Sequence, residues 1–211
     1  PVFNWLEQYF DSYGVIILLL TLIIKLLLIV PMYRVYKSSA KMRLLKPELD
    51  EIKERTGGDM QKMQQEQMKL YKQAGVSPLG GCLPQLVQIP ILFAMFRFFP
   101  ASIELRQERL WWAEDLSSYD SIYDFPNGFE IPFYGDHISL FTLMMTAVTL
   151  IYTVTNSQSS GQLAGPMKTV IYIMPIMFLG FFNNYAAALS FYYFLSTCIT
   201  IIQNFIIRKF I

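Results

Sequence analysis

The chain has 211 residues, of which 54% are hydrophobic and 16% aromatic, and its formal net charge is +1. A soluble domain of this size would interleave apolar and polar residues at the period of a helix or a strand, but here the apolar residues occur in long blocks. The small net charge gives no sign of a nucleic-acid partner, and no direct nucleic-acid site is evident. The sequence therefore predicts an all-α membrane protein, in which the positions of the charges matter more than their sum.

Five apolar blocks are long enough to cross the bilayer as transmembrane helices. A crossing needs about 20 mainly apolar residues. The last apolar stretch, 167–207, would be about 60 Å long as a single helix, which is twice the hydrocarbon thickness. Asn183 and Asn184 form the polar break near its middle, so we expect the chain to turn back there. The predicted spans are 14–32, 77–100, 138–155, 167–183 and 184–207.

The connecting segments differ sharply in their content of Lys and Arg. Residues 33–76 contain ten, whereas 101–137 contain two against eight acidic residues, and 1–13 contain none. Lys168 and the Arg208–Lys209 end fall on the same side as the ten, which gives a bias of thirteen to two. Positive residues are enriched in cytoplasmic segments. We therefore expect 33–76, 156–166 and 208–211 to be cytoplasmic, and 1–13 and 101–137 to be extracytoplasmic.

The segment 33–76 is predicted to form a cytoplasmic helical hairpin. Leu45, Leu49 and Ile52 repeat at helical spacing, and the sequence TGGD that ends at Asp59 is a stop, turn and helix-capping signal. A second helix follows and ends at Gly75. Two interpretations stay open: a solvated connector, or an arm that docks a ribosome, a targeting receptor or a nascent chain.

The sequence SIELRQERLWWAEDL begins the extracytoplasmic loop. It places Ile103, Leu110 and Trp111 on one helical face. Tryptophan at the edge of a span is typical of a helix that lies in the membrane interface. We therefore expect an interfacial helix here. Because the chain opens at Pro1 without a charged leader, we also expect that a longer protein continues before it.

Lys25 lies inside the first span, about 10 Å of helix from its cytoplasmic end. A lysine at this depth costs about 2.5–3.5 kcal/mol on insertion scales, so it is expected to face a protein interior or a water-filled cavity. The alternative is that its long side chain reaches the cytoplasmic interface. A cavity is favoured by polar residues at matching depths, although no acidic residue occurs in any span. These residues are Thr21, Gln85, Gln88, Thr200, Gln203 and Asn204.

Several blocks of the sequence resemble the YidC membrane-insertase family, which includes the mitochondrial Oxa and chloroplast Albino proteins. They are KMRLLKPELDEIKERTGGDMQKMQQEQMKLYKQAGVSPLGGCLPQLVQIPILFAMF, IELRQ with WAEDLS, MPIMF, and SFYYFLSTCITIIQNFI. The resemblance covers nearly all of the chain from about Gly14. It implies a five-helix core around a hydrophilic groove that opens to the cytoplasm and sideways to lipid in the bacterial inner (plasma) membrane.

The family resemblance also implies roles for individual residues and partners. A positive residue in the first core span, typically arginine, attracts the polar tail of the incoming protein, and it aligns with Lys25. Thr21 and Tyr193 carry over by position. The implied partners are nascent membrane proteins and the lipid bilayer, with the Sec translocon, the ribosome and the signal-recognition receptor.

The function that these features predict is that of an insertase and chaperone for nascent membrane proteins, acting alone or beside the Sec translocon. The apolar helix of the client would slide along spans two and four, including Leu92, Phe96 and Phe178. We expect no enzymatic activity, cofactor or metal, since neither a phosphate-binding GxxxxGK[ST] loop nor a catalytic set of residues is present. A coupled transporter, a structural assembly subunit and an intramembrane protease are the alternatives. A coupled transporter usually needs acidic residues within the membrane, and this chain has none in its predicted spans. A purely structural subunit would not need a polar groove. An intramembrane protease would need paired catalytic residues, which the sequence does not show.

Overall fold

The computed structural model describes residues 2–76, 83–126, 129–157 and 166–210. These residues are mostly helical, which confirms the all-α class in its coarse form. One further element was not predicted, a small antiparallel sheet that pairs β1 (Tyr123–Asp124) with β2 (His137–Ile138). One-turn 3₁₀ helix η2 (Ile103–Leu105) precedes it.

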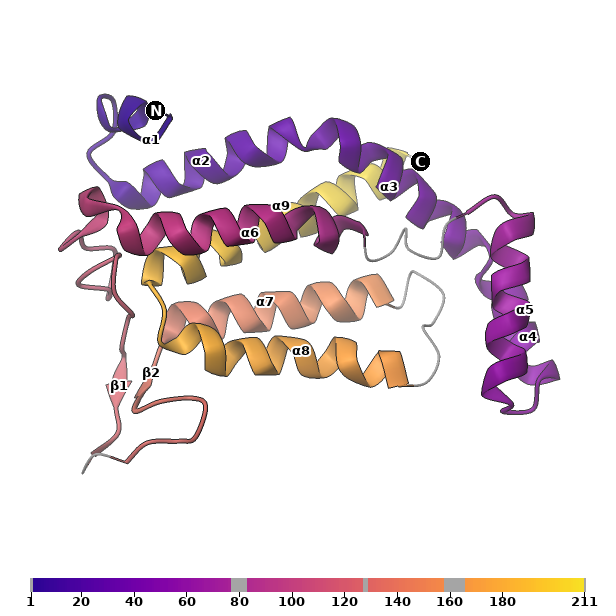
Figure 1. Ribbon diagram of the computed structural model, residues 1–211. Helices are drawn as coiled ribbons and strands as arrows, with labels where there is room; N and C mark the ends of the chain where they lie inside the picture. The colour runs from indigo at the N-terminus through magenta and orange to yellow at the C-terminus, as the bar shows by residue number, and fades with distance from the viewer. Residues whose placement is uncertain (1, 77–82, 127–128, 158–165, 211) are drawn as a thin grey trace.

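Five helices form the body of the molecule and run side by side (Figure 1). Helix α9 packs against α7, α2 and α6, and α8 lies against the far side of α7. The main core lies between these helices, and its largest fully buried side chains include Tyr192, Phe99, Phe141 and Phe182. The five helices are α2 (Tyr13–Leu27), α6 (Leu83–Ala101), α7 (Leu140–Ser157), α8 (Pro166–Asn183) and α9 (Ala187–Phe210).

Only α9 has a stretch, Ala187–Ile207, that meets criteria of both length and hydropathy for crossing a membrane, among the residues that the structure describes. The other body helices contain shorter apolar stretches of 10–17 residues. Helix α2 ends at Leu27, before the end of the expected span 14–32, and α3 (Ile29–Leu44) follows after a break at Leu28. Proline at position 31 has no backbone N–H to donate to the carbonyl of Leu27, which accounts for the end of α2 there.

The hairpin consists of α4 (Lys46–Arg55) and α5 (Met60–Gln73), which lie side by side beyond one end of the body (Figure 1). Glycines 57 and 58 have positive φ angles of 57° and 92°, and the Asp59 carboxylate caps α5 by accepting the backbone N–H groups of Gln61 and Lys62. The hairpin has a small core of its own, made by Leu49, Tyr71 and Val76. It therefore folds around contacts separate from those of the main core.

The prediction of an interfacial helix after α6 is wrong. Only η2 is helical, and Gln107 and Trp111 adopt left-handed φ angles of 63° and 55°. The chain is drawn into the body instead, because Leu105 and Leu116 are fully buried in the main core. The carbonyl of Leu116 also accepts the N–H of Ala188 at the start of α9, a bond that it could not offer inside a helix.

The segment 1–13, expected as a plain lead-in, contains α1 (Val2–Glu7). Phe3 and Leu6 are buried in the main core, and the ring of Phe3 lies 5.4 Å from that of Phe98 on α6. This short amphipathic helix therefore covers the end of the body at which α2 begins.

Candidate functional site

Lys25 joins three helices. Its amine on α2 donates to the Thr200 hydroxyl of α9 at 2.9 Å and to the amide oxygen of Gln88 on α6 at 3.3 Å. Both acceptors are neutral. The amine therefore keeps polar partners inside the body without a carboxylate to neutralise it, which leaves its charge available to an anion that reaches it.

Lys25 lines a pocket of about 610 Å³, a volume that includes the space open at its mouth. The pocket lies between α2, α3, α6, α7 and α9. Its described lining mixes apolar and hydroxyl side chains with Lys25 as the cation and contains no carboxylate. The lining residues are Lys25, Leu28, Met32, Val87, Gln88, Thr149, Tyr152, Tyr193, Ser196, Thr197, Thr200 and Gln203.

The polar groups of the pocket are oriented by their own hydrogen bonds. The Thr200 hydroxyl donates to the carbonyl of Ser196 at 2.8 Å, so its lone pairs are free to accept from Lys25. The amide nitrogen of Gln88 donates to the Tyr192 hydroxyl at 3.2 Å, which turns its oxygen toward the amine. Each partner of Lys25 is thus held with an acceptor facing the amine.

The structure brings together most of the residues that the sequence singled out. Lys25, Gln88, Tyr193, Thr200 and Gln203 all line the pocket. Two predicted groove residues do not. Thr21 is fully buried and its hydroxyl donates to the carbonyl of Ile17 at 2.6 Å, and Asn204 is buried outside the lining. The side chain of Gln85 lies outside the described residues.

Sequence reasoning missed the contributions of α7 and of the middle of α9. Thr149 and Tyr152 line the pocket from α7, and Ser196 and Thr197 line it from α9. A signal existed for Ser196, which lies one turn before Thr200 on the same helical face. On α7 the spacing of three between Thr149 and Tyr152 also places both on one helical face.

The expected client-contact residues are partly buried. Leu92, Phe96 and Phe178 pack against the main core. The ring of Phe96 on α6 lies 5.8 Å from that of Phe181 on α8, which links these two helices directly. Phe93 on α6 is much more exposed, at 67%.

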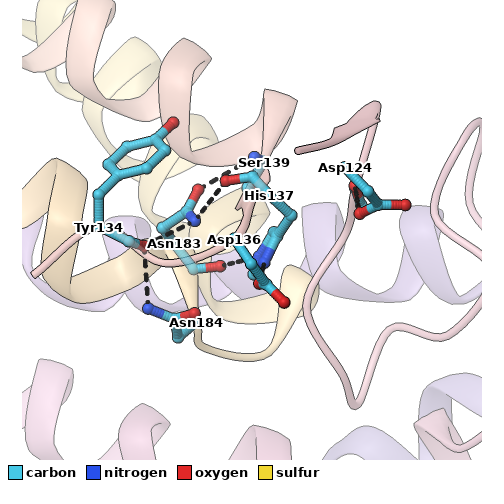
Figure 2. A network of polar contacts seen from close by, with 8 residues as sticks. Asp124, Tyr134, Asp136, His137, Ser139, Asn183 and Asn184 are labelled. Carbon is cyan, nitrogen blue, oxygen red and sulfur yellow. Dashed lines mark hydrogen bonds and ion pairs between the residues drawn. The ribbon is translucent and has the colours of Figure 1, made fainter. Parts of the chain in front are cut away.

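A second polar network lies at the opposite end of the body from the hairpin (Figure 2). The buried Asn183 amide donates to the carbonyls of Tyr134 and His137, and its oxygen accepts the N–H of Ser139 at 3.0 Å. His137 contacts the Asn183 carbonyl through Nε2 and the Asp136 carboxylate through Nδ1, each at 2.9 Å. The latter hydrogen bond lowers the pKa of Asp136.

This network ties the loop that carries β2 to the turn between α8 and α9. All but one of its hydrogen-bond partners are backbone groups, so its role is to fix the chain rather than to offer a reactive group. Among the described residues, no group of three or more His, Cys, Asp or Glu side chains is placed to hold a metal ion.

Comparison with known proteins gives one consistent result. The profile of the family described as 60Kd inner membrane protein matches residues 5–211. Proteins named membrane protein insertase YidC from Amoebophilus asiaticus and Cytophaga hutchinsonii are 50% and 54% identical over the whole chain. The protein of that name from Parabacteroides distasonis is 47% identical over 99% of the chain. The chain spans about a third of the length of these relatives, 35%, 34% and 34% respectively.

Proposed function

The chain belongs to the 60Kd inner membrane protein family, and from that premise we propose that it inserts nascent membrane proteins into the inner membrane without catalysing a covalent reaction. The single observation that carries this proposal is the amine of Lys25, held between α2, α6 and α9 by two neutral acceptors in a polar pocket.

The mechanism that we propose is electrostatic. When a polar client segment enters hydrocarbon, each backbone group without a hydrogen-bond partner costs several kcal/mol of free energy. The hydroxyl and amide groups of the pocket would lower that cost along part of the path, and Lys25 would attract an acidic tail. The membrane potential adds about 2.3 kcal/mol per charge per 100 mV in favour of moving negative charge outward. No nucleotide would be needed.

We propose that α2, α6, α7, α8 and α9 are the five spans. Support comes from the apolar stretch in each helix and from the thirteen-to-two distribution of Lys and Arg between the two sides. In this arrangement the α4–α5 hairpin and the carboxyl end are cytoplasmic, while α1, η2 and the β1–β2 loop are extracytoplasmic. The pocket would then open toward the cytoplasm and toward lipid.

We propose that the apolar helix of the client leaves the pocket along α6 and α8. Leu92, Phe96 and Phe178 form the inner part of this surface, and the exposed side chains of Phe93 and Met177 extend it outward. The cytoplasmic hairpin would receive the ribosome, the targeting receptor or the Sec translocon.

The deciding experiment compares Lys25→Arg, Lys25→Gln and Lys25→Met in the full-length protein, with client proteins that differ only in whether the translocated tail is acidic or neutral. Arg keeps the charge, Gln keeps polar bonding without charge, and Met removes both. We expect Arg to preserve insertion, and Gln and Met to impair the acidic client more than the neutral one. The attraction lost is about 1–4 kcal/mol, between the limits for bulk water and a partly screened pair at about 4 Å.

Neutralising the acidic residues of the client tail should then shrink the defect of the Met variant. Equal and undiminished insertion of both clients by the Met variant would overturn the electrostatic mechanism. A defect in Met that Gln restores would assign the role of Lys25 to hydrogen bonding between helices instead of charge.

A further inference from the structure

The loop between β1 and β2 contains a tight turn with an unusual residue at its tip. The N–H of Tyr134 donates to the carbonyl of Ile131 at 3.0 Å, so Pro132 and Phe133 are the two central residues. Phe133 has a φ angle of 68°. Proline followed by a residue of positive φ is the arrangement of a type II turn, in which glycine or asparagine normally takes the second central position. Phenylalanine is strained there.

No packing of the Phe133 side chain against the described protein compensates for that strain. Phe133 is 98% exposed, so its side chain packs against no described part of the chain. Residues held in strained backbone conformations cluster at functional sites, where the strain serves to present a side chain. The turn presents a phenyl ring outward.

The turn is fixed against the last part of α8. A Cβ atom at Gly180 would lie only 2.6 Å from the carbonyl oxygen of Phe133, so glycine at this position lets the loop touch the helix. The side chains of Asn183 and Asn184 both donate to the carbonyl of Tyr134, at 3.0 and 3.1 Å. Figure 2 shows these two asparagines converging on the backbone of Tyr134, the residue after Phe133. The position of Phe133 along α8 is therefore set by the fold.

The surface beside the tip is apolar. On α8, Ile176, Met177 and Phe181 are 58%, 66% and 51% exposed. On the loop, Phe129 is 60% exposed. The turn meets α8 at Gly180, so its exposed ring is carried on a helix whose exposed side chains are apolar.

We propose that Phe133 enters the outer leaflet of the bilayer and rests among lipid acyl chains at the level of the last turn of α8. This inference rests on the proposed span α8, whose exposed apolar face would contact the same lipid. Lipid fits the surface better than a partner protein, because a protein contact would have to cover the tip and the outer face of a peripheral helix together. The exposed carboxylates of Glu130 and Asp136 flank the tip and limit its insertion to the interface.

The test uses nitroxide labels on single cysteines in the full-length protein, reconstituted in phosphatidylethanolamine–phosphatidylglycerol liposomes. Its native cysteines, Cys82 and Cys198 among them, are replaced by alanine. Labels are placed by Phe133→Cys, by Asp124→Cys on the exposed strand β1, and by Met177→Cys on α8. We expect the labels at 133 and 177 to be accessible to oxygen and shielded from a polar nickel complex, and the label at 124 to show the reverse.

Each other outcome has a distinct meaning. A label at 133 as accessible to the nickel complex as that at 124, with 177 in lipid, would overturn the insertion of Phe133 alone. An aqueous label at 177 would overturn the span α8 and hence the proposed architecture. A label at 133 shielded from both reagents would show burial against protein and would also overturn the lipid contact.

A second variant, Phe133→Gly, separates lipid contact from folding. Glycine suits the positive φ angle, so we expect the thermal unfolding temperature in detergent to stay the same or rise. A fall in that temperature would show that Phe133 stabilises the protein itself, contrary to the proposal.

Discussion

Asn183 is the residue on which the end of the body opposite the hairpin depends most. It is fully buried, and its amide serves the backbone groups of Tyr134, His137 and Ser139. Each buried backbone group left without a partner costs about 1–3 kcal/mol. We expect Asn183→Ala to lower the free energy of unfolding by about 2 kcal/mol or more, measured by unfolding in detergent.

The neighbouring Asn184 is a matched control for this prediction. It is exposed, and its amide donates to the carbonyl of Tyr134, which Asn183 also serves. Asn184→Ala should therefore cost less than about 1 kcal/mol, since that carbonyl keeps a partner and the site is open to water. Equal losses in the two variants would contradict the assignment of Asn183 as the buried centre of the network.

At the same scale, the sequence predicted some site residues and not others for a clear physical reason. Lys25 and Gln88 stand out because a charge or an amide in an apolar helix needs a partner, and the structure supplies one for each. A hydroxyl carries less information. Thr21 satisfies its own by bonding to the carbonyl of Ile17, and Thr149 does the same with Met145, yet only Thr149 lines the pocket.

At the scale of elements, the hairpin offers the clearest experiment. Its core of Leu49, Tyr71 and Val76 is separate from the main core. We expect that deleting residues 48–72 leaves the thermal stability of the body unchanged while reducing insertion, if the hairpin receives the targeting machinery. A flexible polar segment of equal length is the control that separates the structure of the hairpin from its reach.

Two results would be informative against this view. Full insertion of several clients after the deletion would reduce the hairpin to a connector. A large loss of stability would show that it supports the body, which the separate cores argue against.

Sequence signals sufficed for the hairpin because they are local. The capping carboxylate of Asp59 and the turn at residues 57 and 58 act within a few residues, and the structure has both. The prediction of an interfacial helix was wrong because contacts with residues distant in the sequence determine the conformation of that segment. The carbonyl of Leu116 accepts a hydrogen bond from the backbone N–H of Ala188 at the start of α9, and the side chain of Leu105 is buried in the main core.

At the scale of the whole molecule, orientation across the membrane is the main property open to test. Ser118 and Gln64 are exposed; Ser118 lies in the loop between η2 and β1, and Gln64 lies in the hairpin on α5. In cells whose protein has had its native cysteines replaced, Cys82 and Cys198 among them, a membrane-impermeant thiol reagent should label Ser118→Cys from outside and spare Gln64→Cys. Permeabilised cells, in which both should react, provide the control, and the reverse pattern would invert the proposed topology.

The sequence indicated the apolar helices, but it could not indicate which of them occupies the centre. Helix α9 takes that place, and the small side chains of Ala186, Ala187 and Ala188 at its start are all buried. These small side chains allow the loop between η2 and β1 to approach closely, so that the backbone carbonyl of Ser118 accepts the N–H of Ala187 at 2.6 Å. Such packing depends on shape between segments about 70 residues apart, which no periodicity within one segment records.

The two hydrogen bonds of Lys25 have a kinetic consequence. A client carboxylate that reaches the amine can take its third N–H or exchange with Thr200 or Gln88. In an exchange the gain is only the difference between a hydrogen bond to a charged acceptor and one to a neutral acceptor. Residence time grows about tenfold for every 1.4 kcal/mol of added affinity at a fixed association rate. An amine with no such partners would hold each tail for long and delay the next. Exchange against Thr200 and Gln88 instead favours a brief dwell, after which the amine returns to its resting contacts as the tail departs.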